Sequence, residues 1–213
     1  MPDTLHKTIT DTSSARYTDR GSRFYAHAGP AIDSKSIDKF RTEITKKYPD
    51  ASHHCYAWRL NPFQPQEFTQ DDGEPGGTAG MPILSAIRSE KLINILVIVA
   101  RYFGGTKLGK PGLIHAYREA AGSAIACAPK SALRKYVPYI VKYPYDQENR
   151  IRELVNRFQM HVRDEKYVET VTLTLYCLPE YSGELHGILR HLEYAGVQFQ
   201  TRPESYQIDK QQE

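Results

Sequence analysis

Apolar positions in the first half of the chain recur with the periods of helices and strands. The run Ile93–Arg101 is apolar on both alternating faces, which predicts a central strand covered by helices on one side and partly on the other. A helical stripe follows Asp33 and Ser34, either of which is a suitable N-cap. The stripe consists of Ile37, Phe40, Ile44 and Tyr48.

Shorter patterns complete this half. Strands are expected at residues 23–28 and 52–60, and helices at residues 82–88 and 113–128. Residues 63–80 carry little periodicity, which predicts a long irregular connection of the kind that is often functional or mobile.

The second half repeats the alternation in a different order. Strands are expected at residues 136–143, in a hairpin that ends near residue 177, and at residues 197–201, with two helical stripes between them. The order strand, helix, strand, strand, helix, strand is that of ferredoxin-like domains. We therefore predict an α+β chain with domains at residues 1–132 and 136–203, and a polar tail at residues 204–213 that frays.

Composition narrows the class of protein. The 213 residues are 40% hydrophobic and carry a net charge of +3, which permits an anionic partner without requiring one. Three widely spaced cysteines indicate neither a disulfide framework nor a zinc site. No apolar run is long enough to span a membrane and no signal peptide is recognisable, so a cytoplasmic protein with no membrane partner is expected.

Two loops are more particular in composition than connections require. Residues 71–80 read Asp-Asp-Gly-Glu-Pro-Gly-Gly-Thr-Ala-Gly, and residues 101–109 read Arg-Tyr-Phe-Gly-Gly-Thr-Lys-Leu-Gly. With the segment His-His-Cys-Tyr-Ala at residues 53–57, these motifs resemble the Impact/YigZ family over roughly residues 21–128. Residues 136–202 resemble the small C-terminal domain that bacterial members append.

The resemblance implies a fold for each domain and a role connected with translation. The first domain would share the fold of the second domain of ribosomal protein S5, and the second would resemble a ferredoxin-like domain of elongation factor G. Eukaryotic relatives regulate a translational-control kinase pathway by binding a partner protein, and bacterial members have been proposed to bind nucleic acid. No established reaction and no cofactor come with the family.

The chain departs from the family pattern at Lys110, Pro111 and His115, where a glycine-rich turn and an arginine are expected. Pro111 removes an amide donor, unless it lies in the first turn of the next helix, where that loss costs nothing. A histidine in place of arginine makes a phosphate contact weaker and pH-dependent, and Lys110 adds charge nearby.

The basic loop has the components of an anion site that also stacks bases. The residues expected to bind phosphate or RNA are Arg101, Tyr102, Phe103, Gly104, Gly105, Lys107 and Lys110. An equally open interpretation makes both aromatic residues core and assigns the glycine pair to a strained turn. Arg101 would then pair with Asp71 or Asp72.

The acidic loop is expected to order the site. Asp71, Asp72 and Glu74 resemble part of a magnesium or calcium site, but turn and helix-cap chemistry is the favoured role, and no metal is assigned. An ion pair between Arg101 and Asp72 is expected to lock the two loops together.

His53 and His54 are expected to help order the loops, from opposite faces of their strand. His53 would share its face with Cys55, and His54 would share the other with Tyr56. A nucleophilic set of Cys55, His53 and Asp71 is conceivable, but free cysteines are usually buried packing residues.

The expected function is therefore binding of RNA, or of a ribosome-associated partner, in the modulation of translation, with no catalytic residue and no cofactor. One alternative is a hydrolase, either metal-assisted through residues 71–74 with His53 or His54, or thiol-based through Cys55. Another is a protein-interaction adaptor that binds no nucleic acid.

Overall fold

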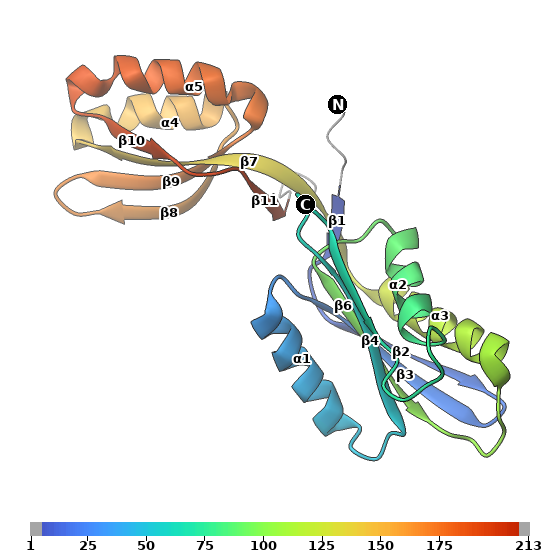
Figure 1. Ribbon diagram of the computed structural model, residues 1–213. Helices are drawn as coiled ribbons and strands as arrows, with labels where there is room; N and C mark the ends of the chain where they lie inside the picture. The colour runs from blue at the N-terminus through green and yellow to red at the C-terminus, as the bar shows by residue number, and fades with distance from the viewer. Residues whose placement is uncertain (1–5, 209–213) are drawn as a thin grey trace. The chain divides into compact units, whose positions relative to one another are not determined.

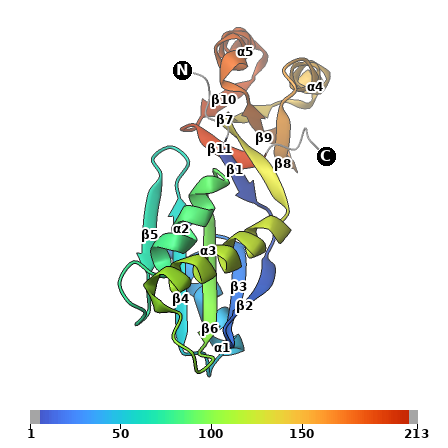
Figure 2. The ribbon, with the colours of Figure 1, turned by 90° about the vertical axis from the view of Figure 1, so that its right-hand side faces the viewer.

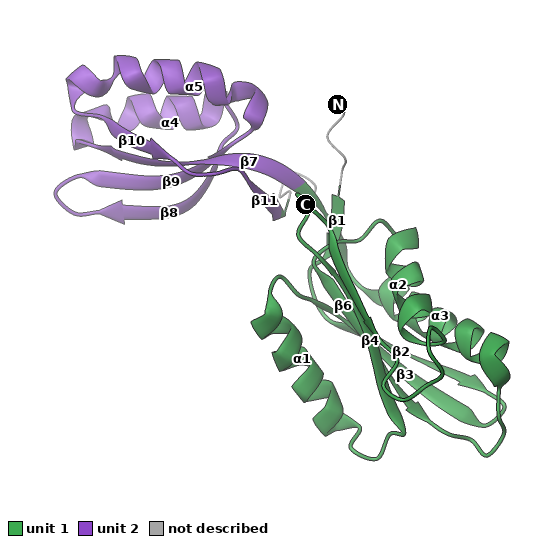
Figure 3. Cartoon of the chain, in the orientation of Figure 1, with its two compact units in different colours: residues 1–133, 208–213 green, residues 134–207 purple. Residues whose placement is uncertain are grey.

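The computed structural model describes residues 6–208. The chain divides into two compact units, with the boundary between Leu133 and Arg134 (Figure 3). Unit 1 also takes in Ile208, and unit 2 ends at Gln207. Each unit has its own sheet and its own helices (Figure 1).

Unit 1 is built on an antiparallel sheet of five strands. In their order across the sheet the strands are β2 (Ser13–Asp19), β3 (Ser22–Pro30), β6 (Ile95–Tyr102), β4 (His53–Leu60) and β5 (Gln66–Gln70). The expected central strand is β6, whose first seven residues are all buried. Helices α2 (Gly80–Ser89) and α3 (Gly109–Cys127) cover one face, and α1 (Ser34–Lys47) covers the middle of the other (Figures 1 and 2).

Local sequence explains how these helices begin and pack. Asp33 is the N-cap of α1, as expected: its carboxylate accepts from the Ser36 backbone N–H, and the Ser36 hydroxyl closes a capping box. In α3, Ala116, Ala120 and Ala124 are fully buried, so small side chains bring this helix close to the sheet. Helix α3 begins before the expected position, at Gly109, which places Pro111 in its first turn, where proline is tolerated.

The sequence patterns did not predict three strands in the first 70 residues of the chain. The connection expected to be irregular contains β5, an edge strand in which Phe68 lies opposite Trp58. Strand β2 was also missed, because its outward positions are exposed and polar. Strand β1 (His6–Ile9) pairs with residues 130–133 and is too short to show a period.

Unit 2 follows the predicted order of elements. They are β7 (Lys130–Tyr143, which begins in unit 1), α4 (Glu148–Arg157), β8 (His161–Tyr167), β9 (Val171–Cys177), α5 (Pro179–His191) and β10 (Gln198–Thr201), with short 3-10 turns at Tyr145–Gln147 and Glu193–Ala195. The strands lie in the order β10, β7, β9, β8, all antiparallel. Both helices cover one face of this sheet (Figure 1).

The expected frayed tail is wrong at Ser205–Ile208, which form strand β11 and pair with β7. The polar composition of this segment hid a strand whose backbone hydrogen bonds, rather than buried side chains, hold it in place. Residues 209–213 of the predicted tail lie outside the described residues. Within the part of the chain that is described, no helix has the length and apolar character needed to cross a membrane.

Truncating Ile87 of α2, which is fully buried, should cost far more than truncating Ile114 of α3, which is 43% exposed. We expect Ile87→Ala to lower the free energy of unfolding by about 2–5 kcal/mol, and Ile114→Ala by less than about 0.5 kcal/mol. Urea unfolding followed by the fluorescence of Trp58, the only tryptophan, reports on unit 1. Equal effects of the two variants would contradict the assigned core.

Candidate functional site: two interlocked loops

A buried ion pair joins the acidic loop to the end of β6. Arg101 is 5% exposed, and its Nη1 donates to Oε1 of Glu74 at 2.5 Å. The expected partner of Arg101 was Asp72, with Asp71 as the alternative, and both assignments are wrong. The carboxylates of Asp71 and Asp72 accept hydrogen bonds from backbone N–H groups instead. Glu74 alone turns inward, and its side chain is 3% exposed.

Further groups share the buried carboxylate. The hydroxyl of Tyr117, on α3, donates to Oε1 of Glu74 at 2.7 Å, and Sγ of Cys55 lies 3.3 Å from that hydroxyl. Nε2 of His53 lies 3.9 Å from the same carboxylate oxygen. Two buried charges are costly unless they are paired and hydrogen-bonded, and these donors supply much of the compensation on the carboxylate side.

Ser22 links the pair to the basic loop. Its hydroxyl accepts from Nη2 of Arg101 at 3.4 Å and from the backbone N–H of Gly104 at 3.2 Å. The fully buried Ser22 therefore ties β3, β6 and the loop at one point. Nothing in the sequence pattern singled out Ser22 or Tyr117, since one hydroxyl among many carries no periodic signal.

The acidic loop acts by turn and cap chemistry, the role favoured from its composition. The Asp71 carboxylate accepts from the backbone N–H groups of Gly77, Ala79 and Gly80 at 2.8–3.0 Å and so caps α2. Partial burial opposes ionisation, but these three donors prevail and lower the pKa of Asp71. Asp72 accepts from the backbone N–H of His54 at 2.6 Å, which fastens the loop to β4.

The two histidines point to opposite faces of β4, as predicted. Nδ1 of His53 lies 2.7 Å from the carbonyl oxygen of Asp72, and because a carbonyl only accepts, this nitrogen is the donor. Nε2 of His54 lies 3.0 Å from the carbonyl oxygen of Tyr48, on the α1 side. His53 shares its face with Cys55, and His54 shares its face with Tyr56.

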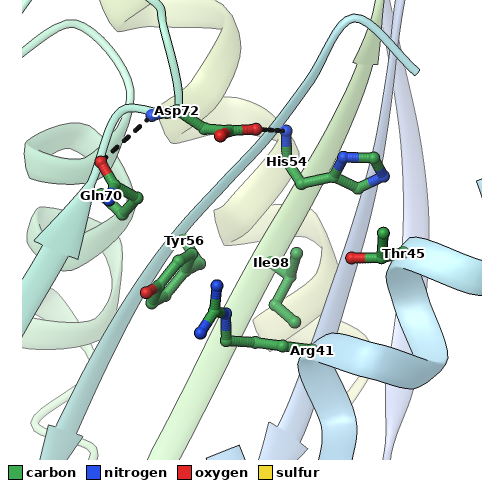
Figure 4. Close-up of a pocket in the computed structure, with 7 residues that line it drawn as sticks. All are labelled: Arg41, Thr45, His54, Tyr56, Gln70, Asp72 and Ile98. Atoms are coloured by element: carbon green, nitrogen blue, oxygen red, sulfur yellow. Dashed lines mark hydrogen bonds between the residues drawn. The ribbon is translucent and has the colours of Figure 1, made fainter. Parts of the chain in front are cut away.

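A small hollow opens on the His54 side of the sheet (Figure 4). Its volume is about 200 Å³, below the range usual for small-molecule sites. Arg41 lies beside Tyr56 there, its guanidinium carbon 4.4 Å from the ring centroid. The hollow is lined by Arg41, Thr45, His54, Tyr56, Gln70, Asp72 and Ile98.

The glycine pair of the basic loop is required by geometry. A Cβ on Gly104 would lie 1.9 Å from the backbone carbon of Gly21 in the turn between β2 and β3, so only glycine fits. Gly105 has a φ of +86°, which glycine adopts without strain. The interpretation that assigned the glycine pair to a strained turn therefore fits the structure. The expectation that both aromatic residues belong to the core does not fit, because Phe103 is 52% exposed and Tyr102 is half-buried.

The residues expected to bind phosphate therefore separate into two groups. Arg101 faces inward and is committed to Glu74, so its expected role as a surface phosphate contact does not fit its burial. Phe103, Lys107 and Lys110 are exposed. The contact of Gly104 with Gly21 places the exposed Arg20 and Arg23, which the sequence analysis did not single out, at the same end of the sheet.

Cys55 is a packing residue that donates a hydrogen bond. It is fully buried, its Sγ donates to the carbonyl oxygen of Asp71 at 2.9 Å, and burial raises the pKa of the thiol to about 12. A thiol in this state holds its proton at neutral pH, which is the opposite of an activated nucleophile. Within residues 6–208 no three His, Cys, Asp or Glu side chains are grouped as a metal site requires.

Comparison with known proteins agrees with the motifs. The family model described as the Impact N-terminal domain matches residues 20–125, which include both loops and the whole of the buried network. The chain belongs to the IMPACT family. It is 35% identical over 162 residues to an IMPACT family member of Thermus thermophilus, covering 76% of this chain and 87% of that protein.

Two more relatives show how far the similarity extends. The chain is 30% identical over 176 residues to the IMPACT family member YigZ of Escherichia coli, covering 79% of this chain and 86% of that protein. Human Protein IMPACT is 34% identical over 101 residues, 46% of this chain and 32% of that one. The crystal structure of a hypothetical protein matches the fold with a TM-score of 0.67 and 24% identity, over 92% of this chain and 96% of that chain.

Removing the buried carboxylate should destabilise unit 1 far more than removing an exposed one. Glu74→Ala strands the Arg101 charge inside the protein, and we expect a loss of about 3–5 kcal/mol. Glu90→Ala breaks an exposed pair with Lys130 and should cost less than about 1 kcal/mol. Urea unfolding measures both variants, and a similar small loss in each would show that the buried pair does not hold the loops.

The thiols should differ sharply in reactivity. Cys127 is exposed, whereas Cys55 and Cys177 are buried and burial raises the pKa of Cys177 to about 11. A disulfide reagent at pH 8 should modify one thiol in the native protein, none in Cys127→Ser, and all three thiols once the native protein is unfolded. Rapid labelling of Cys55 in the native state would restore the thiol-enzyme hypothesis.

Proposed function

We propose that this protein binds RNA, free or within the ribosome, and modulates translation without turning over a substrate. The proposal is supported chiefly by the exposed Phe103, Lys107 and Lys110 on a loop whose base is fixed by the buried pair of Arg101 and Glu74. Cations that hold phosphate beside an aromatic ring that stacks on a base are the common elements of single-strand recognition.

Order in the loop adds to this argument. A flexible loop loses conformational entropy when a ligand fixes it, so a loop already held by its protein contacts binds with a smaller loss. Here the N–H of Gly104 is held by Ser22, and Leu108 is buried at the start of α3. The loop that carries Phe103 and Lys107 is therefore fixed at both of its ends.

Membership of the IMPACT family supports a role in translation, and the order of elements in unit 2 supports its assignment as a ferredoxin-like domain. The order β7, α4, β8, β9, α5, β10 is that of a ferredoxin-like domain, and the family resemblance relates it to elongation factor G. Unit 1 would correspond to the second domain of ribosomal protein S5. Action in the cytoplasm, on the translation machinery, is part of the same proposal.

A protein-interaction adaptor is the second candidate, and a groove lined by both apolar and polar residues favours it. The groove has a volume of about 540 Å³ between α1 and the end of β4, and Ile32 beside it is 71% exposed. Phe63 and Phe68, in the neighbouring connection and in β5, are 54% and 42% exposed. Exposed apolar groups gathered in this way are characteristic of surfaces that bind other proteins.

Neutralising the loop lysines should weaken RNA binding and its salt dependence together. For Lys107→Ala with Lys110→Ala we expect the slope of log affinity against log salt, for a single-stranded RNA, to fall by roughly 1.4, since each phosphate contact on a single strand contributes about 0.7. Lys35→Ala with Lys39→Ala removes the same charge from exposed positions of α1 and should leave the slope unchanged.

Fluorescence anisotropy across a salt series, with RNA and with ribosomes, measures both double variants. If both double variants lowered the salt slope equally, the loop lysines would contribute only non-specific positive charge and would not form a binding site. Absence of RNA and ribosome binding by the native protein would overturn the proposal in favour of the adaptor.

A further inference from the structure

Three tyrosines from three elements gather on the α1 side of the unit 1 sheet. The rings of Tyr25 on β3 and Tyr48, which ends α1, are stacked, with centroids 5.1 Å apart and an angle of 22°. Tyr102 at the end of β6 meets Tyr25 edge to face at 5.8 Å. All three are half-buried, so part of each ring is open to solvent.

Each ring carries a cation. The Arg16 guanidinium lies 5.7 Å from the centroid of Tyr25, and the Arg23 guanidinium lies 5.3 Å from that of Tyr102. The sheet register explains both pairs, because Arg16 is directly opposite Tyr25, and Arg23 is directly opposite Tyr102. Nζ of Lys47 lies 5.6 Å from the Tyr48 centroid. We call these six residues the tyrosine face.

The cations of the tyrosine face are not neutralised by the protein. Among residues 6–208, no carboxylate forms an ion pair with Arg16, Arg23 or Lys47, all of which are exposed. Several other arginines in the described part of the chain do pair with a glutamate or an aspartate. Those in ion pairs are Arg41, Arg59, Arg88, Arg101, Arg152 and Arg157.

The orientation of the rings is set by a buried partner. Oη of Tyr48 lies 2.9 Å from Nε2 of His27, which is 6% exposed and lies beneath α1 on β3. Burial, with help from the nearby Lys47, lowers the pKa of His27 to about 4, so this partner is neutral at neutral pH. The platform is therefore formed before any ligand arrives, and its positive charge comes from the exposed cations alone.

The tyrosine face is continuous with the basic loop. Tyr102 immediately precedes Phe103, and Arg23 follows Ser22, which binds the N–H of Gly104. Alternation along β6 turns Arg101 inward and Tyr102 outward. A strand of RNA held at Phe103 thus has a second set of cations and rings directly beside it.

We propose that single-stranded RNA bound at the basic loop continues across the tyrosine face, with its phosphates on Arg16, Arg23 and Lys47 and two or three bases against the tyrosines. This rests on the proposed function and extends it by naming the second half of the site. Unpaired cations call for an anion, and flat open rings call for a stacking partner, and single-stranded nucleic acid supplies both. An acidic peptide would satisfy only the first requirement.

The test separates charge from stacking. With an unstructured uridine 12-mer, Arg16→Gln with Arg23→Gln should lower the salt slope by roughly 1.4. Tyr25→Leu with Tyr102→Leu should weaken binding roughly tenfold or more at unchanged slope, because lost base stacking is independent of salt. Tyr25→Phe with Tyr102→Phe keeps both rings and should bind as the native protein does.

Controls address folding and alternative ligands. Tyr181→Leu with Tyr194→Leu removes exposed tyrosines of unit 2 and should leave binding unchanged. The native Trp58 unfolding transition in every variant excludes misfolding as the cause.

Native affinity in both face variants, with binding still weakened in the Lys107 and Lys110 variant, would overturn this inference and leave the proposed function standing. If the native protein binds no RNA, both fail. Equal competition by an acidic peptide of the same charge would also overturn it, since it would show that the bases make no contribution.

Discussion

The buried pair of Arg101 and Glu74 is the interaction on which the acidic loop and the basic loop of unit 1 depend. Neither loop has regular structure of its own to hold it, and the pair joins them across 27 positions of sequence at 2.5 Å. Charges in such a place are retained only with further hydrogen bonds, which Tyr117 and Ser22 provide. The acidic loop is thereby held against β4 and α2, and the basic loop against the turn between β2 and β3.

This arrangement changes which cations are available to a ligand. Arg101 has the residue type and position expected of a phosphate contact, but its charge is already balanced inside the protein. Among the described residues around it, exposed cations in no ion pair include Lys107 and Lys110 beyond it, and Arg16, Arg23 and Lys47 on the tyrosine face. A single step along β6, from Arg101 to Tyr102, separates the structural face of the sheet from the face that we assign to binding.

Much of the fold follows from apolar periodicity. The β6 run, the α1 stripe with its Asp33 cap and the order of elements in unit 2 all lie where the patterns place them. Strands β2, β5 and β11 do not, because edge strands with polar outward positions bury too little to show an alternation.

The sequence predicted many residues of the candidate site, but it did not predict which of them contact one another. Adjacent residues on a strand face opposite ways, which correctly separated His53 from His54. Which of three carboxylates reaches Arg101 depends on a turn with positive φ at Asp72 and Gly73, and composition does not reveal that Asp71 is already engaged by α2. The tyrosine face needed the register between β2, β3 and β6, which no single segment contains.

The most direct test of this account asks whether Arg101 positions the loop or contacts RNA. Replacing both members of the buried pair, Arg101→Met with Glu74→Met, removes one positive and one negative charge together and leaves no charge unpaired. The salt slope of RNA affinity should then equal that of the native protein, because no phosphate contact has been lost. A slope lower by roughly 0.7 would mean that Arg101 contacts a phosphate and would contradict the account.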